Sequence, residues 1–214
     1  MAATKLGLFN GALRLCKERK LANLSESREP RRLLDEAYGD GSTDGSIRRC
    51  LEMGKWTFAM RTVRLDFSPS IEPDFGYRYA FDHPTDMVNV AAVCSDEYFN
   101  QPLTQYADER GYWYADLQTI YIRYVSNDAD YGADLSLWPQ VFTDMVEADL
   151  AREIVGNLTG ADSDRIEKHY KDAKARALSN DAMKKPTAFF PRGGWASARH
   201  GGRNDRGSRD SLTG

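Results

Sequence analysis

The sequence predicts an α+β fold that is mainly α: an antiparallel helical bundle with a small antiparallel β-sheet insertion and an extended C-terminal arm. Apolar residues recur at helical spacing near both ends of the chain and alternate with a period of two between them. After Ser179 neither pattern continues. We therefore expect a helical bundle over residues 1–60 and 136–180, an inserted β unit over 61–135, and an extended basic tail over 181–214.

Three helices are expected before residue 60. Thr4 can cap the first, in which Leu6, Phe9, Leu13 and Cys16 form one apolar stripe. Pro30 suits the first turn of a short second helix. The glycine-rich segment 39–46 then breaks the periodicity, and a third helix is expected from about Thr43 or Asp44.

The period of two defines the inserted β unit. Alternating apolar residues predict strands near residues 61–67, 88–92 and 120–124, with a shorter candidate at 112–115. Prolines and Asp/Asn clusters separate these segments.

The strongest helical signal follows Ser136, which we expect to cap it. Its apolar face is too broad for a surface helix, so this helix should be packed on two sides until Gly160 ends it. A last helix from Asp162 or Ser163 has a single apolar stripe and should lie outside. The residues expected in the bundle core are Trp56, Trp138, Phe142, Met145, Val146 and Leu150.

Charge is distributed unevenly along the 214 residues. The chain carries a net charge of −3, but residues 184–214 hold seven Lys and Arg against two Asp, which leaves −8 for residues 1–183. Such an acidic body is unlike a nucleic-acid-binding domain. The three cysteines are too far apart for a CxxC site or a disulfide framework, which favours a reducing compartment. No apolar run approaches the length that spans a bilayer.

No motif predicts a metal site, a cofactor or a catalytic centre. Residues 40–45 (DGSTDG) match the first positions of a calcium loop, but Leu51 stands where a bidentate Glu should close it, so we expect a turn. The histidines at 83, 169 and 200 lie on separate elements without ligand spacing. We therefore expect a protein that is not an enzyme and binds no cofactor.

A carbohydrate site is the alternative that the β unit suggests. Asp108 and Glu109 lie near four aromatic residues, and sugar-binding enzymes combine carboxylates with aromatic platforms. The aromatic residues are Tyr106, Tyr112, Trp113 and Tyr114. Adjacent carboxylates in a turn point in different directions, so a solvated turn before an aromatic strand is the favoured interpretation.

The C-terminal tail contains apolar side chains with no core of their own. Its aromatic and basic residues predict a docking arm that orders on a partner surface. The arm residues are Phe189, Phe190, Arg192, Trp195 and Arg199. For residues 200–214 we expect no more than solvated chain.

The order of these elements resembles the phage head-tail connector adaptors typified by tail tubular protein A of short-tailed coliphages. The resemblance runs in register from about residue 20 to 199. Its motifs are residues 55–59 (KWTFA) with the strand 61–67, and residues 77–90, 120–125, 137–142 and 191–199.

The resemblance implies a structural protein of the virion neck, assembled in the host cytoplasm. Its partners would be the portal protein, further copies of itself in a ring of usually twelve, a downstream tail or nozzle protein, and the genomic DNA that passes through. An acidic body suits a channel through which DNA must slide. Three alternatives stay open: another neck component such as a tail-completion or stopper protein, a carbohydrate-binding tail component, and a cellular protein with no phage role.

Overall fold

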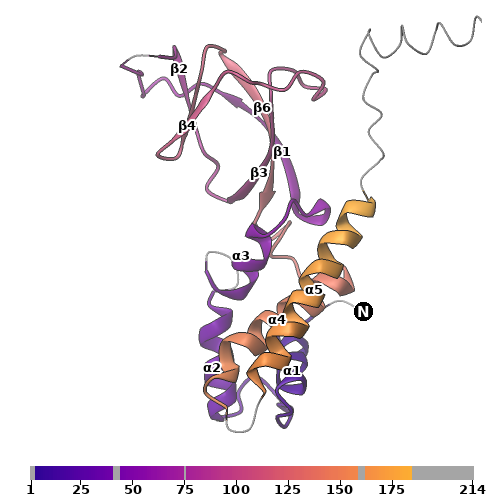
Figure 1. The fold of residues 1–214 in the computed structure, drawn as a ribbon. Helices are drawn as coiled ribbons and strands as arrows, with labels where there is room; N and C mark the ends of the chain where they lie inside the picture. Colours follow the sequence, from indigo (N-terminus) through magenta and orange to yellow (C-terminus); the bar gives the residue numbers. More distant parts are fainter. Residues whose placement is uncertain (1–2, 41–43, 75, 159–161, 185–214) are drawn as a thin grey trace, which may run out of the picture. The chain divides into compact units, whose positions relative to one another are not determined.

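The computed structural model describes residues 3–40, 44–74, 76–158 and 162–184. These residues form five α-helices and two three-stranded antiparallel sheets (Figure 1). The helices are α1 (Lys5–Leu15), α2 (Glu29–Tyr38), α3 (Gly45–Glu52), α4 (Gln140–Val155) and α5 (Ser163–Lys184). The strands are β1 (Met60–Asp66), β2 (Tyr79–Asp82), β3 (Met87–Cys94), β4 (Ala107–Glu109), β5 (Tyr112–Ala115) and β6 (Thr119–Ser126).

The predicted fold class is wrong. The described chain is a mixed α/β fold, about 40% helix and 20% strand, and not a helical bundle with a small insertion. The prediction missed β2 and β4, which are four and three residues long and too short to show a clear alternation. These two strands flank β5 and complete a second sheet. The β region therefore has its own apolar core between sheets, which a small insertion would not have.

The first three helices begin close to where the sequence predicts, but the third, α3, ends at Glu52, before Trp56, which the sequence had assigned to it. The Thr4 hydroxyl accepts a hydrogen bond from the Gly7 amide at 3.1 Å and so caps α1. The break between α2 and α3 uses Gly39 and Gly45, whose φ angles are +65° and +79°, a conformation that glycine adopts without strain. A Cβ at residue 45 would lie 2.0 Å from the Tyr38 carbonyl oxygen, so the turn also needs glycine for space.

Helix α4 is the centre of the helical region. It packs against α1, α2, α3 and α5. Of the residues expected in the core, Trp138 is 8% exposed and Trp56, Phe142, Met145, Val146 and Leu150 are at most 1% exposed. The expected cap at Ser136 is wrong, because α4 begins at Gln140 after Pro139, and a residue before proline is disfavoured in a helix. The helix also ends earlier than expected, at Val155.

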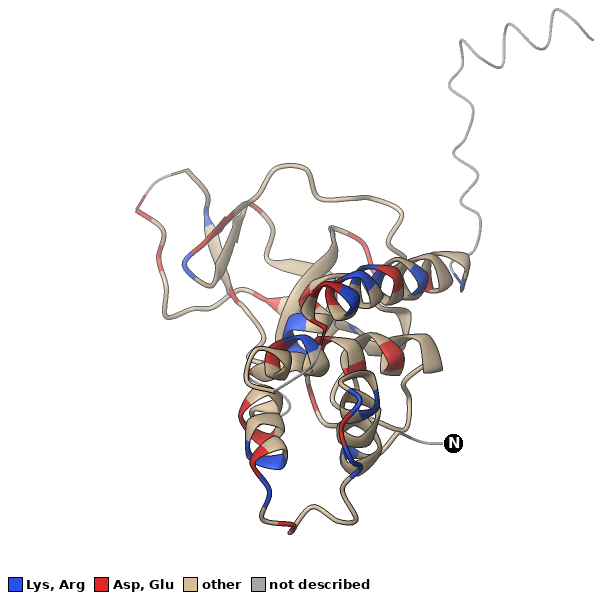
Figure 2. Cartoon of the chain, turned by 60° about the horizontal axis from the view of Figure 1, so that its bottom comes forward, with Lys and Arg blue, Asp and Glu red and all other residues tan. Residues whose placement is uncertain are grey.

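Helix α5 packs on α4 through one stripe, as expected of an outer helix. Its buried apolar residues are Ile166, Tyr170, Ala173 and Ala177. Acidic and basic residues alternate along the ribbon of this helix (Figure 2). The helix continues to Lys184, past the predicted boundary at residue 180, and Asp181 in its last turn is buried.

The two sheets divide the strands between them. The first has the order β1-β6-β3, with Val63 opposite Ile122 in the β1–β6 pair. The second has the order β2-β5-β4, with Phe81 opposite Trp113 in the β2–β5 pair. Apolar side chains from both sheets form one cluster. Its buried members are Phe81, Val93, Trp113, Ala115, Ile120, Ile122 and Tyr124.

The predicted docking arm lies outside the described residues. This holds for Phe189, Phe190, Arg192, Trp195 and Arg199 alike. Within the described ranges, no helix has the length and apolar character needed to cross a membrane.

Candidate functional site

The segment between α3 and β1 joins the helices to the sheets. The Trp56 indole Nε1 donates a hydrogen bond to the Cys50 carbonyl at 3.0 Å, which fixes the ring under the end of α3. Its ring centre lies 4.9 Å from that of Phe142 on α4, and the ring centre of Phe58 lies 4.8 Å from that of Phe142. Trp56 and Phe58 therefore both pack edge to face on Phe142, at the junction between the helices and the sheets.

The same segment holds the end of α5. The carboxylate Oδ1 of Asp181 accepts hydrogen bonds from the Thr57 amide at 2.8 Å and from the Thr57 hydroxyl at 2.7 Å. Asp181 is only 7% exposed, so both bonds are shielded from water. These bonds hold the last turn of α5 to the segment before β1. Sequence analysis assigned Asp181 to the tail and missed this role.

A buried carboxylate on α4 binds two arginines. Asp149 has a fully buried side chain, with Arg49 of α3 at 3.0 Å and Arg152 of α4 at 2.9 Å. The Arg152 guanidinium lies 4.4 Å from the centre of the Tyr170 ring on α5. These contacts connect α3, α4 and α5. The only sign in the sequence was an Asp within the broad apolar face of α4.

Asp86 is the polar centre of the first sheet. It accepts hydrogen bonds from Arg61 at 2.8 Å, from Ser126 at 2.5 Å and from the Tyr124 hydroxyl at 3.1 Å. Burial favours a higher pKa for Asp86, but the hydrogen bonds from Ser126, Arg61 and Tyr124 outweigh it and keep the pKa below its usual value. The carboxylate is thus charged near neutral pH and links β1, β6 and the turn before β3.

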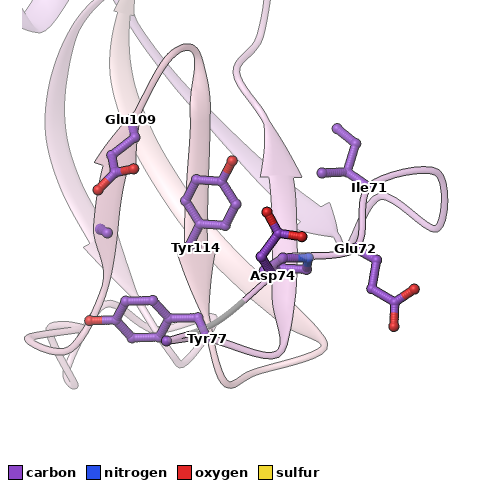
Figure 3. A pocket seen from close by; sticks show the side chains of 9 residues that line it. Ile71, Glu72, Asp74, Tyr77, Glu109 and Tyr114 are labelled. Atoms are coloured by element: carbon purple, nitrogen blue, oxygen red, sulfur yellow. The ribbon is translucent and has the colours of Figure 1, made fainter.

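A pocket of about 360 Å³ opens at the second sheet. It lies between the loop that precedes β2 and strands β4 and β5 (Figure 3). Its lining residues are Ile71, Glu72, Pro73, Asp74, Gly76, Tyr77, Ala107, Glu109 and Tyr114. In Figure 3 the Tyr114 ring is seen between the carboxylates of Glu109 and Asp74, whereas Glu72 points away from them. The pocket therefore combines carboxylates with tyrosine rings.

The structure does not bring the residues of the predicted carbohydrate site together at one place. Asp108 accepts a hydrogen bond from the Trp113 indole at 2.9 Å and lies 3.3 Å from the His83 Nε2 atom. Trp113 is fully buried, with its ring 4.0 Å from that of His83, so it cannot serve as a sugar platform. Glu109 and Tyr114 line the pocket instead. The two acids point apart, but not in the predicted turn: both lie in β4, where neighbouring residues face opposite sides of the sheet.

The remaining two aromatic residues of that site lie elsewhere. Tyr106 packs against the apolar cluster of the sheets. The Tyr112 ring lies 6.5 Å from that of Tyr114 but is not part of the pocket lining.

The segment that resembles a calcium loop is described only in part, because residues 41–43 lie outside the described ranges. The Asp40 amide donates to the Asp44 carboxylate at 2.9 Å, and the Asp44 amide donates to the Asp40 carboxylate at 3.2 Å. These reciprocal bonds belong to the turn between α2 and α3. Among the described residues, no group of three or more His, Cys, Asp or Glu side chains is placed to hold a metal ion.

Neither the comparison with protein-family models nor the search of curated proteins found a match to this chain.

Proposed function

We propose that the protein is a structural subunit of a bacteriophage neck: a head-tail connector adaptor that forms a ring under the portal and continues the DNA channel to the tail. The observation that carries the proposal is the pair of hydrogen bonds between Thr57 and Asp181, which hold the last turn of α5, the helix that precedes the basic C-terminal segment, to the segment before β1. An arm that binds a partner can hold the subunit in a defined position only if the helix from which the arm continues is itself fixed to the subunit.

The segments that resemble the adaptor family contact one another, which supports the proposal. Trp56 from the KWTFA segment packs on Phe142 from residues 137–142. Asp86 from residues 77–90 accepts a hydrogen bond from Tyr124 of residues 120–125. Each of these two contacts joins motifs that are far apart in the sequence, as expected if the motifs together specify one fold.

The distribution of charge also supports it. Residues 1–183 carry a net charge of −8 and the following segment is basic. Acidic surfaces repel the phosphates of a DNA molecule passing through a channel, whereas clustered lysines would hold it. Aromatic and Arg side chains in the arm are those most enriched at the energetic centres of protein interfaces.

Removal of the arm tests the proposal. A chain truncated after Lys184 keeps Asp181 and its bonds to Thr57, whereas truncation nearer the predicted boundary would also remove this contact. The matched control is truncation after Arg199, which removes only the segment for which we expect no docking role. We expect electron microscopy of each protein mixed with its portal to show rings with the control and none with the shorter chain.

A single substitution gives a sharper form of the test. Trp195→Ala should weaken portal binding by about 30-fold, because truncation of a buried Trp anchor costs about 2 kcal/mol or more. Rings that form equally well after truncation at Lys184 would contradict the docking role. Binding of the ring below a different neck protein, rather than under the portal, would favour a tail-completion or stopper protein.

The carbohydrate-binding alternative has lost two of its proposed residues, because Trp113 is buried and Asp108 is bonded to it. A glycan array that gives no binding would remove this alternative.

A further inference from the structure

The side chain of Glu147 lies in the contact between α4 and α1. It is only 12% exposed. A Cβ atom at Gly11 of α1 would lie 2.0 Å from the carboxyl carbon of Glu147, and 2.1 and 2.4 Å from its two oxygens. The carboxyl group therefore fills the space that a side chain at residue 11 would need, and glycine at this position makes room for it between the two helices.

A negative charge on this carboxyl group is poorly compensated. Its ion-pair partner Arg14 is 3.5 Å away and 68% exposed, so water competes for the contact. The other charged group that acts on it is Asp144, one turn earlier on α4, which repels a negative charge. By contrast, Asp149 on the same helix has two arginines within 3.0 Å. The closed contact therefore favours the neutral acid, and burial raises the pKa of Glu147 to about 7.

Helix α1 can separate from α4 without the loss of another helix or strand. It packs mainly on α4, with a smaller contact on α2, and Arg165 of α5 donates one hydrogen bond to the Leu15 carbonyl. Residues 16–28, which contain no helix or strand, join it to α2. Its buried apolar side chains are Leu8, Phe9, Ala12 and Leu13. Their burial keeps α1 closed whatever the charge of Glu147, so that charge changes how often the helix opens locally.

We infer that Glu147 and Gly11 form a proton-controlled latch: with a proton on the carboxyl group α1 is held against α4, and without it α1 opens more often. When α1 opens, the carboxyl group meets water and its pKa returns to the usual value of 4.5. The closed state therefore binds more protons than the open state between about pH 4.5 and pH 7, and it loses stability as the pH rises through this range. The inference does not depend on the proposed function.

Two cysteines can report this opening in the full chain. Cys16 follows the last residue of α1 and is 4% exposed, and its thiol Sγ donates to the Ala151 carbonyl of α4 at 3.8 Å. Cys50 on α3 is fully buried in the helical core. Local opening of α1 exposes Cys16 and leaves Cys50 buried, whereas global unfolding exposes both thiols to the same extent.

Labelling of the thiols with a maleimide at pH 8, followed for each cysteine by mass spectrometry of its peptide, tests the inference. In the unchanged protein Cys16 should react faster than Cys50. In Glu147→Gln, whose amide stays neutral, Cys16 should react about 30-fold more slowly than in the unchanged protein. Arg14→Gln removes the positive partner of the carboxylate and should make Cys16 react faster. The control Glu36→Gln, at an exposed position of α2, should react as the unchanged protein does.

Hydrogen exchange between pH 5 and pH 8 gives a second measurement that needs no substitution. After division by the intrinsic exchange rate at each pH, the opening constant of the α1 amides should rise about 30-fold and should exceed that of the α4 amides at pH 8.

Three outcomes would overturn the inference. The first is equal labelling of Cys16 in the unchanged protein and in Glu147→Gln. The second is equal labelling of Cys16 and Cys50, which would mean that α1 opens only when the whole protein unfolds. The third is an opening constant of α1 that does not change with pH. None of these measurements involves the portal, so the proposed function is tested separately.

Discussion

The helical core and the sheet core of this protein differ in how they treat charge. The two buried carboxylates among the described residues, Asp149 and Asp181, both lie on helices. Between the sheets the buried members of the cluster are apolar or aromatic, and the carboxylates Asp86 and Asp108 bond to it from positions that are partly exposed.

The helical core and the sheet core therefore differ in the contacts that fix their geometry. A buried ion pair has few alternative partners, so it fixes the orientation of the helices that carry it, at a cost in desolvation. A dry core between sheets gains stability from apolar burial and leaves its polar groups at the rim. Substitutions of charged residues should therefore affect the helical region more strongly than the sheets.

The largest effect is expected at Arg49. Arg49→Met removes one of the two partners of Asp149 and should lower the free energy of unfolding by about 3 kcal/mol, because a buried carboxylate is left partly unpaired. Urea unfolding followed by circular dichroism measures this change. Arg48→Met is the matched control, since Arg48 pairs with the half-exposed Glu52 and should cost about 0.5 kcal/mol. Equal losses in the two variants would show that the burial of Asp149 does not make its ion pair more important than an exposed one.

An intermediate effect that depends on pH is expected at Glu147. Its carboxyl group lies against α1, where a Cβ at Gly11 would be 2.0 Å from it, and Arg14 lies 3.5 Å away. Burial raises the pKa of Glu147 from 4.5 to about 7, against the lowering effect of Arg14, and Asp144 raises it further. Between these two pH values the folded protein binds more protons than the unfolded chain, so its stability falls as the pH rises towards 7.

Glu147→Gln should remove this dependence. At pH 8 we expect the variant to be more stable than the unchanged protein by about 2 kcal/mol, while the two should be similar at pH 5. Thermal unfolding at a series of pH values measures it. Glu36→Gln, at an exposed position of α2, is the control and should follow the unchanged protein. The same slope with pH in Glu147→Gln would show that the carboxyl group is not buried against α1.

The smallest effect is expected at the rim of the sheet core. Asp108→Ala removes the acceptor of the Trp113 indole hydrogen bond and should cost about 1 kcal/mol. Burial lowers the pKa of His83 and Asp108 raises it, so the variant should show a lower His83 pKa in an NMR titration. Glu109→Ala, on the opposite face of β4, should leave the His83 pKa unchanged. A larger loss of stability than that of Arg49→Met would reverse the proposed order of the two cores.

The sequence predicted features that depend on local periodicity. The cap at Thr4, the break between α2 and α3, the central position of α4 and the strands β1, β3, β5 and β6 all follow from spacing within a few residues. Short strands carry too little pattern, which is why β2 and β4 were missed and the fold class was wrong.

The candidate sites depended more strongly on long-range contacts. The divergence of Asp108 and Glu109 was predicted for a turn, whereas the two residues lie in β4 and diverge because adjacent residues on a strand face opposite sides. The meeting of Glu109 with Asp74 and Tyr77 could not be predicted, since these residues are more than thirty positions apart and share a pocket only through the pairing of the second sheet.

The sequence by itself determined the approximate positions of the five helices and the four longer strands, and how charge divides between body and tail. It also determined that Trp56 and Phe142 are buried. Only the tertiary structure decided which carboxylates are buried, which side chains bond to them, and that Asp181 belongs to α5. The physical reason is that periodicity is a property of neighbouring residues, whereas the environment of a charge is set by side chains that folding brings from distant parts of the chain.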